Sequence, residues 1–315
     1  MYDKVKFWID AAAGDTTLSA VADRLQVAKE YTDRQTGETQ IIGDIDNISV
    51  QLHPNGASVI CNFPKVLYNS NIYPISLKTS KEAIEKIADT LHADMSGAKV
   101  TAFEFGGNFI MNNKVSDYLR LLGGAAYYTQ LEQAGGDSLY YLSRGKAQRK
   151  KAVFYDKIAD AEAKGIEYPD NLQGANLLRY ELRLKWRLAS LLRVPQVTAE
   201  TLTDEAFYSK LVQLYKDTYF SISKQKQMKI EPTKQVQTVG DAFNVFMARL
   251  ISDADKSIIA DYMQELKAAN VFTDPKYYTR LRNRLEQVAG AAKFTESDEL
   301  VKELDDAIIN ATSYL

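Results

Sequence analysis

The sequence predicts an α+β protein in which an antiparallel sheet carries helices on one face and leaves a polar active-site face open, followed by an all-helical C-terminal domain. Three observations predict this. The first half of the chain alternates apolar and polar residues with the period of two that half-buried strands require. The last third spaces its apolar residues as amphipathic helices do. Val194-Pro195 is the natural boundary between them, so the predicted domains are residues 1–193 and 194–315.

Strand and helix patterns follow one another along the first domain. Six segments alternate as strands, at residues 2–10, 47–53, 57–63, 100–111, 151–157 and 177–185. Pro54-Asn55-Gly56 joins the second and third as a hairpin, because Asn-Gly supplies a tight turn. Thr79 and Glu82 predict a capping box for a helix whose apolar face spans residues 83–91. A second, short helix is predicted at residues 115–122.

The second domain shows only helical spacing. Its amphipathic segments are residues 201–220, 239–269, 274–288 and 296–311. The sequence therefore predicts an all-helical second domain.

The composition excludes several classes of protein. Of the 315 residues, 45% are hydrophobic and 25% are charged, which is ordinary for a globular chain. No apolar run approaches the roughly 18 residues of a membrane span, and the first residues read as a strand, so we expect a cytoplasmic protein without membrane contact. The single Cys61 excludes internal disulfides and thiolate zinc clusters. A net charge of −2 confines any DNA contact to a local patch.

One such local patch is the segment RGKAQRKKAVFYDK at residues 144–157. Its cations, opposed only by Asp156, are Arg144, Lys146, Arg149, Lys150, Lys151 and Lys157. Taken alone, a run of this kind is a solvated loop as often as a nucleic-acid contact.

Polar side chains also gather on one face of the predicted sheet, since residues two apart on a strand share a face. Glu104 and Asn108 lie opposite the phenylalanines of their strand, with Gly106 between them leaving room for a ligand to approach. On the strand at 177–185 the outward positions are Arg179, Glu181, Arg183 and Lys185. On the strand at 151–157, Tyr155 and Lys157 share a side, although the apolar pattern does not choose which face it is.

Together these positions make an active-site set of Glu104, Glu181, His53, Asn108, Tyr155, Lys157, Arg183 and Asp10. Carboxylates with an imidazole or amide oxygen suit Mg²⁺ or Mn²⁺, because hard cations favour oxygen ligands. Such a metal polarises a scissile phosphate, and a tyrosine phenolate can attack it and stay attached as a phosphodiester. The competing interpretations are a merely solvated sheet face and an ordinary packed Tyr155 among 19 tyrosines.

The segments AVFYDK, residues 152–157, and LLRYELRLK, residues 177–185, resemble the rolling-circle replication initiators of phages and plasmids, of the filamentous-phage replication protein type and the related plasmid initiators. In that group a tyrosine-x-lysine strand carries the nicking tyrosine, and an arginine-x-glutamate-x-arginine strand supplies an acidic residue. Tyr155, Lys157 and Glu181 match these positions. The segments at 48–68 and 98–123 are similar to the family's early hairpin and acidic strand, so the resemblance covers roughly residues 2–192.

The resemblance implies a metal-dependent, site-specific single-strand endonuclease and strand transferase that holds a DNA 5′-phosphate on Tyr155. Lys157 then stabilises the phenolate or the phosphate. Glu104 and Glu181 hold Mg²⁺ or Mn²⁺, with His53 and Asp10 as further candidate ligands. The candidate DNA-binding residues are Arg144, Lys146, Arg149, Lys150, Lys151, Arg179 and Arg183. The implied partners are origin DNA, single-stranded at the nick, and a host helicase and polymerase. The helical domain at residues 194–315 is then expected to recognise duplex DNA or to bind a partner protein.

Two departures from the family pattern leave other functions open. Members commonly carry arginine-x-aspartate where this chain has Ala102 and Glu104, and a two-histidine metal motif is excluded because His53 and His92 are the only histidines. A relaxase-like mobilisation nuclease shares the chemistry. A noncatalytic DNA-binding accessory or repressor protein is favoured by the missing arginine. A small-molecule enzyme has no support, since the sequence holds no Gly-rich phosphate loop or nucleophile elbow.

Overall fold

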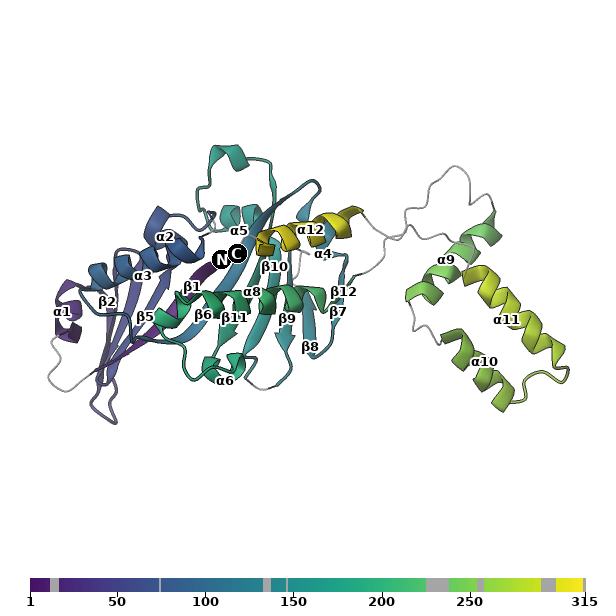
Figure 1. Cartoon of the computed structure of the whole chain (residues 1–315), viewed down its shortest axis with the longest axis horizontal. Helices are drawn as coiled ribbons and strands as arrows, with labels where there is room; N and C mark the ends of the chain where they lie inside the picture. The colour runs from purple at the N-terminus through teal and green to yellow at the C-terminus, as the bar shows by residue number, and fades with distance from the viewer. Residues whose placement is uncertain are drawn as a thin grey trace. The chain divides into compact units, whose positions relative to one another are not determined.

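A computed structural model describes residues 1–11, 17–73, 75–132, 137–145, 147–224, 238–253, 258–289 and 299–313 of the chain. The chain divides into two compact units, Met1–Ser223 with Glu303–Leu315, and Lys224–Lys302. The first unit contains a ten-stranded antiparallel sheet, and the second is helical (Figure 1). The predicted α+β class, with an antiparallel sheet and a helical C-terminal region, is confirmed.

The large sheet has the strand order β2-β3-β4-β5-β1-β6-β11-β10-β9-β8, and β7 pairs separately with β12. The strands are β1 (Tyr2–Asp10), β2 (Gln26–Thr32), β3 (Thr39–Ile45), β4 (Ile48–His53), β5 (Gly56–Asn62), β6 (Lys99–Met111), β7 (Leu122–Ala125), β8 (Tyr128–Glu132), β9 (Ser138–Ser143), β10 (Lys150–Asp156), β11 (Asn176–Lys185) and β12 (Ile222–Lys224). All six predicted strands are present to within one residue at each end. The sequence pattern missed β2, β3, β7, β8, β9 and β12.

Each predicted helical segment contains helix, with shifts at the ends. The helices are α1 (Thr17–Arg24), α2 (Phe63–Tyr68), α3 (Leu77–Leu91), α4 (Val115–Leu119), α5 (Lys157–Ala163), α6 (Leu188–Leu192), α7 (Ala199–Leu202), α8 (Glu205–Phe220), α9 (Val239–Asp253), α10 (Ile258–Ala268), α11 (Lys276–Ala289) and α12 (Glu299–Ser313). Of these, α1, α2, α5 and α6 were not predicted. A 3₁₀ helix spans Asp170–Leu172. Within the described residues, no helix combines the length and the apolar character that crossing a bilayer requires.

The capping box of α3 lies one turn earlier than predicted. The side chain of Ser76 accepts from the backbone N–H of Thr79, and the Thr79 hydroxyl accepts from the Ser76 backbone. The prediction of Thr79 and Glu82 for these roles was wrong, because the helix begins at Leu77 and Thr79 is already its third residue.

Helices α2, α3, α8 and α12 cover one face of the sheet (Figure 1). Aromatic contacts attach α8 to it: the rings of Tyr180 and Tyr215 stack at 4.1 Å, and each hydroxyl donates to the other residue's carbonyl, at 3.0 and 3.1 Å. Tyr219 on α8 donates to Asp305 on α12 at 2.6 Å. Helices α7, α8 and most of α12 therefore belong to the sheet unit, whereas the sequence boundary at residue 194 assigned them to the helical domain.

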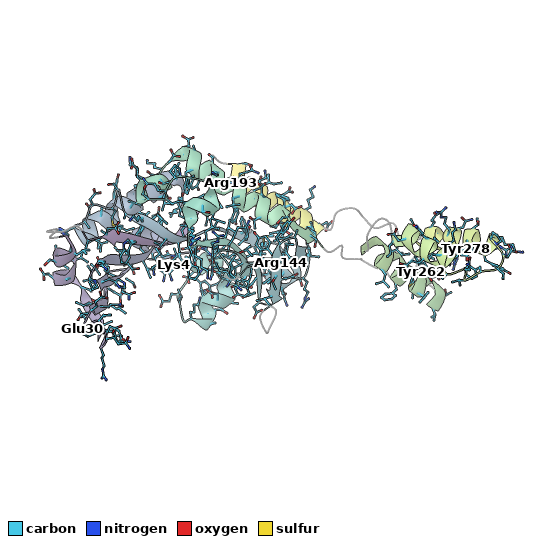
Figure 2. The ribbon with its side chains drawn as sticks, turned by 90° about the horizontal axis from the view of Figure 1, so that it is seen from below. Lys4, Glu30, Arg144, Arg193, Tyr262 and Tyr278 are labelled. Carbon is cyan, nitrogen blue, oxygen red and sulfur yellow. The ribbon has the colours of Figure 1, made fainter. Side chains whose placement is uncertain are left out.

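The second unit is built from α9, α10 and α11. Tyr278 on α11, labelled in Figure 2, accepts from the Phe272 backbone at 3.1 Å and donates to the Leu266 carbonyl at 3.2 Å. These two bonds fix the turn between α10 and α11.

The sheet face opposite α8 is covered at one end. Ile158 of α5 and Leu172 pack with Ile72 and Leu177 in a small apolar cluster. Leu177 belongs to the same face of β11 as Arg179 and Glu181, since it is two and four residues from them. The part of the polar face next to this cluster is therefore shielded from solvent, and the rest stays open.

Candidate active site

The central strands β1, β6, β11 and β10 bring the candidate residues together. In the strand register Tyr155 lies opposite Arg179, and Arg183 lies opposite Glu104. Phe154 stacks on Tyr180 at 4.3 Å on the helix-covered face, which turns Tyr155 to the other face. The structure thus resolves the side of β10 that the apolar pattern left open.

Asp3 joins this group, and the sequence pattern missed it because β1 is irregular. Its pairing with β6 shifts between Tyr2 and Val5, so that three steps on β1 match two on β6, which is a β-bulge. Tyr2 and Val5 are both buried in the core although they are three residues apart. The bulge turns Asp3 to the polar face, where strict alternation would have placed it in the core.

Gly106 allows β6 to approach β11 beside Glu181. A Cβ atom at residue 106 would lie 2.4 Å from the Tyr180 carbonyl oxygen and 3.1 Å from Cγ of Glu181. The sequence suggested that this glycine makes room for a ligand. In the structure the Tyr180 carbonyl and Glu181 of β11 occupy this space, so the reason given for Gly106 was wrong.

Glu181 is the centre of the hydrogen-bond network. The hydroxyl of Tyr155 donates to its Oε1 at 2.8 Å, and Nε of Arg179 donates to the same oxygen. Nε and Nη2 of Arg183 donate to Oε2 at 2.8 and 2.6 Å. The carboxylate is 2% exposed, so its charge is balanced by these two guanidinium groups rather than by water.

Arg179 links Glu181 to the neighbouring strands. It is buried, and its guanidinium donates to Asp3 and, at 2.7 Å, to Oδ1 of Asn108. Asn62 also donates to Asp3. Each strand of the site therefore contributes a group to one connected network, and removal of any member leaves a buried polar atom without its partner.

The two glutamates have opposite electrostatic surroundings. Burial alone would raise the pKa of Glu181, but Arg179 and Arg183 outweigh it and lower the pKa to about 2. Burial and the charge of Glu181 raise the pKa of Glu104 to about 7, and Arg183, whose Nε lies 3.4 Å away, opposes this only partly. Burial and then Glu181 raise the pKa of Tyr155, so its hydroxyl is neutral near pH 7.

Lys157 does not continue β10 but begins α5, where the side chain of Asp156 caps the helix. It is buried, with its ammonium group 3.9 Å from Asp160. Burial and then the charge of Arg179 lower the pKa of Lys157. The positive charge of Lys157 therefore interacts with Arg179 and with Asp3 and Glu181, the carboxylates that Arg179 binds.

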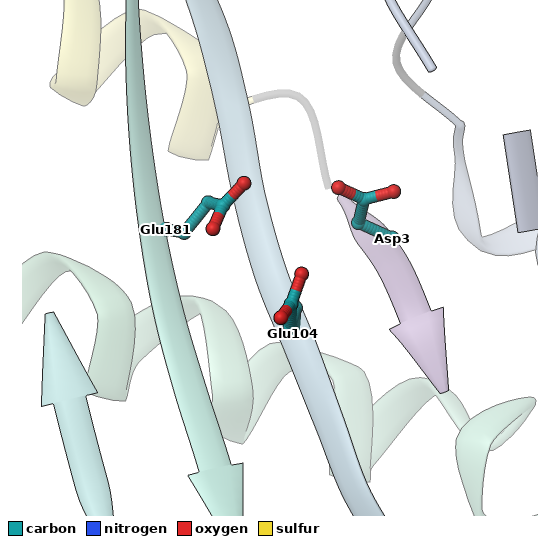
Figure 3. A group of neighbouring side chains, drawn as sticks. All are labelled: Asp3, Glu104 and Glu181. Carbon is teal, nitrogen blue, oxygen red and sulfur yellow. The ribbon is translucent and has the colours of Figure 1, made fainter. Parts of the chain in front are cut away.

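Three carboxylates have the spacing of a cation site. Asp3, Glu104 and Glu181 each offer an oxygen, and these oxygens lie within 4.8 Å of one another (Figure 3). All are hard oxygen donors, and Figure 3 shows them projecting from three neighbouring strands. We call them the carboxylate cluster. Its donor set fits a divalent metal ion.

His53 and Asp10 lie outside the carboxylate cluster. Asp10 is at the opposite end of β1 from Asp3, where it accepts from Nε1 of Trp8 at 2.7 Å and from Nζ of Lys99 at 2.6 Å. The His53 ring lies 5.4 Å from the ring of Trp8. The structure brings Glu104 and Glu181 together and keeps these two residues apart from them.

A cavity of about 410 Å³ adjoins the carboxylate cluster at Glu104. We call it the basic groove, after the cations that line it: Lys4, Lys6, Lys151, Arg183 and Lys185. Ala102 also lines the groove. This is the position at which the family pattern has an arginine. In the strand register Lys185 lies opposite Ala102. The groove therefore supplies a cation beside residue 102.

The predicted DNA-binding residues divide between several places. Lys151 and Arg183 line the basic groove, whereas Lys150 lies on the helix-covered face, 3.5 Å from Thr218, and Arg179 is buried in the network. Arg144 is exposed after β9 (Figure 2). Arg149 is half-buried. Lys146 lies outside the described residues.

Lys4, Lys6 and Lys185 were not among the predicted DNA-binding residues. Each occupies an outward position of its strand, but in the sequence they lie outside the basic run at 144–157. The signal was the strand alternation and not a local cluster of charge.

No protein-family model and no curated protein matches the chain. Among solved structures, it is similar to a rolling circle replication initiator protein from Geobacillus stearothermophilus, with 10% identity, a TM-score of 0.39, and coverage of 74% of this chain and 89% of that one. It is also similar to the di-domain ARO/CYC protein BexL, with 8% identity, a TM-score of 0.22, and coverage of 70% and 97%. At such low identities and TM-scores, neither similarity assigns a function to the chain.

Proposed function

We propose that the chain is a rolling-circle DNA replication initiator, which nicks one strand at an origin and rejoins it through a 5′-phosphotyrosine on Tyr155. The observation that carries the proposal is the Tyr155 hydroxyl, hydrogen-bonded at 2.8 Å to Glu181 beside a carboxylate cluster and a basic groove. A nucleophile, a candidate cation site and an anion-binding surface are the parts that phosphodiester transfer needs.

In the cleavage step, Oη of Tyr155 attacks the phosphorus, and the bond from phosphorus to the 3′-oxygen breaks. The downstream strand remains on the protein as a 5′-phosphodiester, and the 3′-oxygen takes up a proton to become a hydroxyl that a polymerase extends. Glu181 accepts the hydrogen bond that orients the Tyr155 hydroxyl, and the Tyr155 proton passes to solvent as Oη attacks. Attack by a 3′-hydroxyl on the phosphotyrosine reverses the step and rejoins the strand.

Positive charge near Tyr155 stabilises the phenolate and the negative charge on the scissile phosphate. The charge of Arg179 lowers the pKa of the Tyr155 hydroxyl and so opposes the rise that burial and Glu181 cause. Lys157 is the further cation that we assign to the phenolate or the scissile phosphate. Arg183 and Lys151 line the groove on the side of Glu104, and we assign them to the neighbouring phosphates.

Asp3, Glu104 and Glu181 would hold Mg²⁺ or Mn²⁺. When bound, such an ion polarises the phosphate oxygens and offsets the negative charge of the three carboxylates. Because the pKa of Glu104 is about 7, the free cluster carries less negative charge below that pH, and cation binding releases the Glu104 proton.

The partners that follow from this function are origin DNA, single-stranded at the nick, with a host helicase and polymerase, in the cytoplasm. A second candidate function is a noncatalytic DNA-binding accessory or repressor protein. This function is favoured by the hydrogen-bond network around Glu181, in which both carboxylate oxygens accept from arginines, and by the raised pKa of Tyr155.

Covalent capture of DNA separates the two functions. A degenerate single-stranded DNA library, labelled at its 3′ end, is incubated with the protein and Mn²⁺, and the label that stays on denatured protein is measured. The proposal expects labelled wild-type protein, because the downstream fragment keeps the 3′ label. A 5′ label should be released instead.

Tyrosine variants give the control. Tyr155→Phe should form no adduct. Tyr168→Phe should form as much as wild type, since Tyr168 also donates to a glutamate, Glu162 at 2.7 Å, but lies outside the site. The nuclease proposal fails if the wild type forms no adduct or if Tyr155→Phe forms as much as the wild type.

A further inference from the structure

Trp186 is an exposed tryptophan in contact with Lys185, a residue that lines the basic groove. Its side chain is 59% exposed, although tryptophan is among the residues most buried on average. It directly follows Lys185, the last groove residue of β11, and Nζ of Lys185 lies 5.2 Å from the centre of the indole ring. One side of the ring is therefore next to a cation of the groove.

The backbone fixes the place of this side chain. Trp186 and Arg187 have φ angles of 59° and 49°, so two successive residues other than glycine adopt the left-handed conformation. L-residues adopt it at a steric cost, and such strain persists only where surrounding contacts hold it. Here the Trp186 N–H donates to the Thr101 carbonyl at 3.0 Å, which ties the corner to β6.

The chemistry around the ring matches one class of ligand. The basic groove presents Lys4, Lys6, Lys151, Arg183 and Lys185, and among its described lining residues Glu104 is the one acid. Proteins that bind single-stranded nucleic acid combine a cationic path for phosphates with an aromatic side chain on which a base stacks. A duplex meets only the first requirement, because its bases are already stacked on one another.

We propose that Trp186 stacks on an unpaired base of a DNA strand whose phosphates lie along the basic groove. The assignment of the strand as DNA rests on the proposed function, whereas the stacking rests on the groove and the ring. Lys185 follows Glu181 by four positions on β11, which corresponds to about 13 Å along the strand. The stacked base is therefore a few nucleotides from the phosphate that Tyr155 attacks, and Trp186 positions the strand rather than reacting with it.

The chain offers a direct reporter, because Trp8 and Trp186 are its only two tryptophans. In a Trp8→Phe variant all tryptophan fluorescence comes from Trp186. Oligothymidylate is titrated in without divalent cation, and binding is followed by fluorescence anisotropy of a dye on the DNA. We expect the Trp186 emission to be quenched in step with binding. A duplex and an abasic oligomer of the same length should bind through phosphates without this quenching.

Affinity provides the second measurement. Trp186→Leu should weaken oligothymidylate binding by roughly 5- to 150-fold, the range for one stacked base, and Trp186→Tyr should restore most of it. Tyr127→Leu is the matched control, since Tyr127 is an 81% exposed aromatic residue that neither lines the groove nor, unlike Trp186, follows a residue that does, and the affinity of this variant should equal that of wild type. Circular dichroism checks that each variant is folded.

The outcomes separate this inference from the proposed function. Bound oligothymidylate without quenching, or wild-type affinity in Trp186→Leu, overturns the stacking role, even if the Tyr155 adduct forms normally. Quenching and a weakened Trp186→Leu support it even if no adduct forms, in which case the nuclease proposal fails alone. Equal quenching by the abasic oligomer means that the groove binds phosphates only, and it also overturns the stacking role.

Discussion

Replacing Arg179 by methionine tests whether this residue is the counter-charge of the buried carboxylates. The Arg179 side chain is 4% exposed and pairs with Asp3 and Glu181, whose side chains are 6% and 2% exposed. Removing one partner of a buried ion pair costs about 3–5 kcal/mol, because the other partner stays buried and unpaired. Arg183 still binds Glu181 in the variant, so we expect the lower end, about 3 kcal/mol near pH 7.

The penalty should depend on pH in a fixed direction. The arginines lower the pKa of Glu181 from 4.5 to about 2, so their stabilisation is complete above the unfolded value and is lost as the pH falls through the folded one. In the Arg179→Met variant the buried carboxylates bind protons more readily as the pH falls. The loss of stability should therefore be largest near neutral pH and smaller in mild acid.

Urea unfolding of wild type and variant at about pH 7 and about pH 5 measures this. The double variant with Asp3→Asn should lose less stability than the sum of the two single variants, since Asp3 and Arg179 contact each other. A loss below about 1 kcal/mol at neutral pH, or an equal loss at both pH values, would refute the role given to Arg179.

Three further predictions concern single positions of the site. Glu104→Gln should stabilise the metal-free protein by about 1–2 kcal/mol above pH 7 and by less in acid, because the raised pKa of Glu104 makes its ionisation in the folded state unfavourable. Thermal melts at several pH values measure this, and unchanged stability would contradict it. Gly106→Ala should cost about 1–3 kcal/mol in urea unfolding, because its Cβ would lie 2.4 Å from a β11 carbonyl oxygen. Gly124→Ala, with nothing within 4 Å, is its matched control, and equal effects would contradict the prediction. Lys185→Gln should lower the salt dependence of single-stranded DNA binding by roughly 0.7 in log-log slope, whereas Lys81→Gln on α3 should leave it unchanged.

Strand alternation was sufficient to find the residues that lie on regular strands. Glu104, Glu181 and Arg183 occupy the polar positions of β6 and β11, and the register brings them together as the alternation implied. It failed at Asp3, because the bulge between Tyr2 and Val5 reverses the facing of the first residues of β1. A bulge arises from pairing between strands, so the sequence of one strand does not reveal it.

The cover over the polar face was the other feature that the pattern did not predict. Leu177 is the one apolar residue among the charged positions on its face of β11, and it packs under α5 and the segment that follows. That single exception was the available signal. The edge strand β2 was missed for a different reason, since every one of its residues is exposed and its sequence therefore shows no alternation.

The boundary between the units shows the same dependence on tertiary contacts. Helix α8 has the amphipathic spacing expected of a helical domain, but its apolar face packs on the sheet through Tyr215 and Tyr219. Periodicity identified the helix and could not identify its partner.

The central claim is that Tyr155 carries the DNA, and peptide mapping of the adduct tests it most directly. Trypsin cuts after Lys151 and Lys157, and the peptide between these cuts, residues 152–157, contains Tyr155 as its single tyrosine. After the captured DNA is trimmed with a nuclease, mass spectrometry should find the remaining nucleotide on this peptide. A nucleotide on any other tyrosine peptide, or an unmodified 152–157 peptide from the purified adduct, would contradict the account.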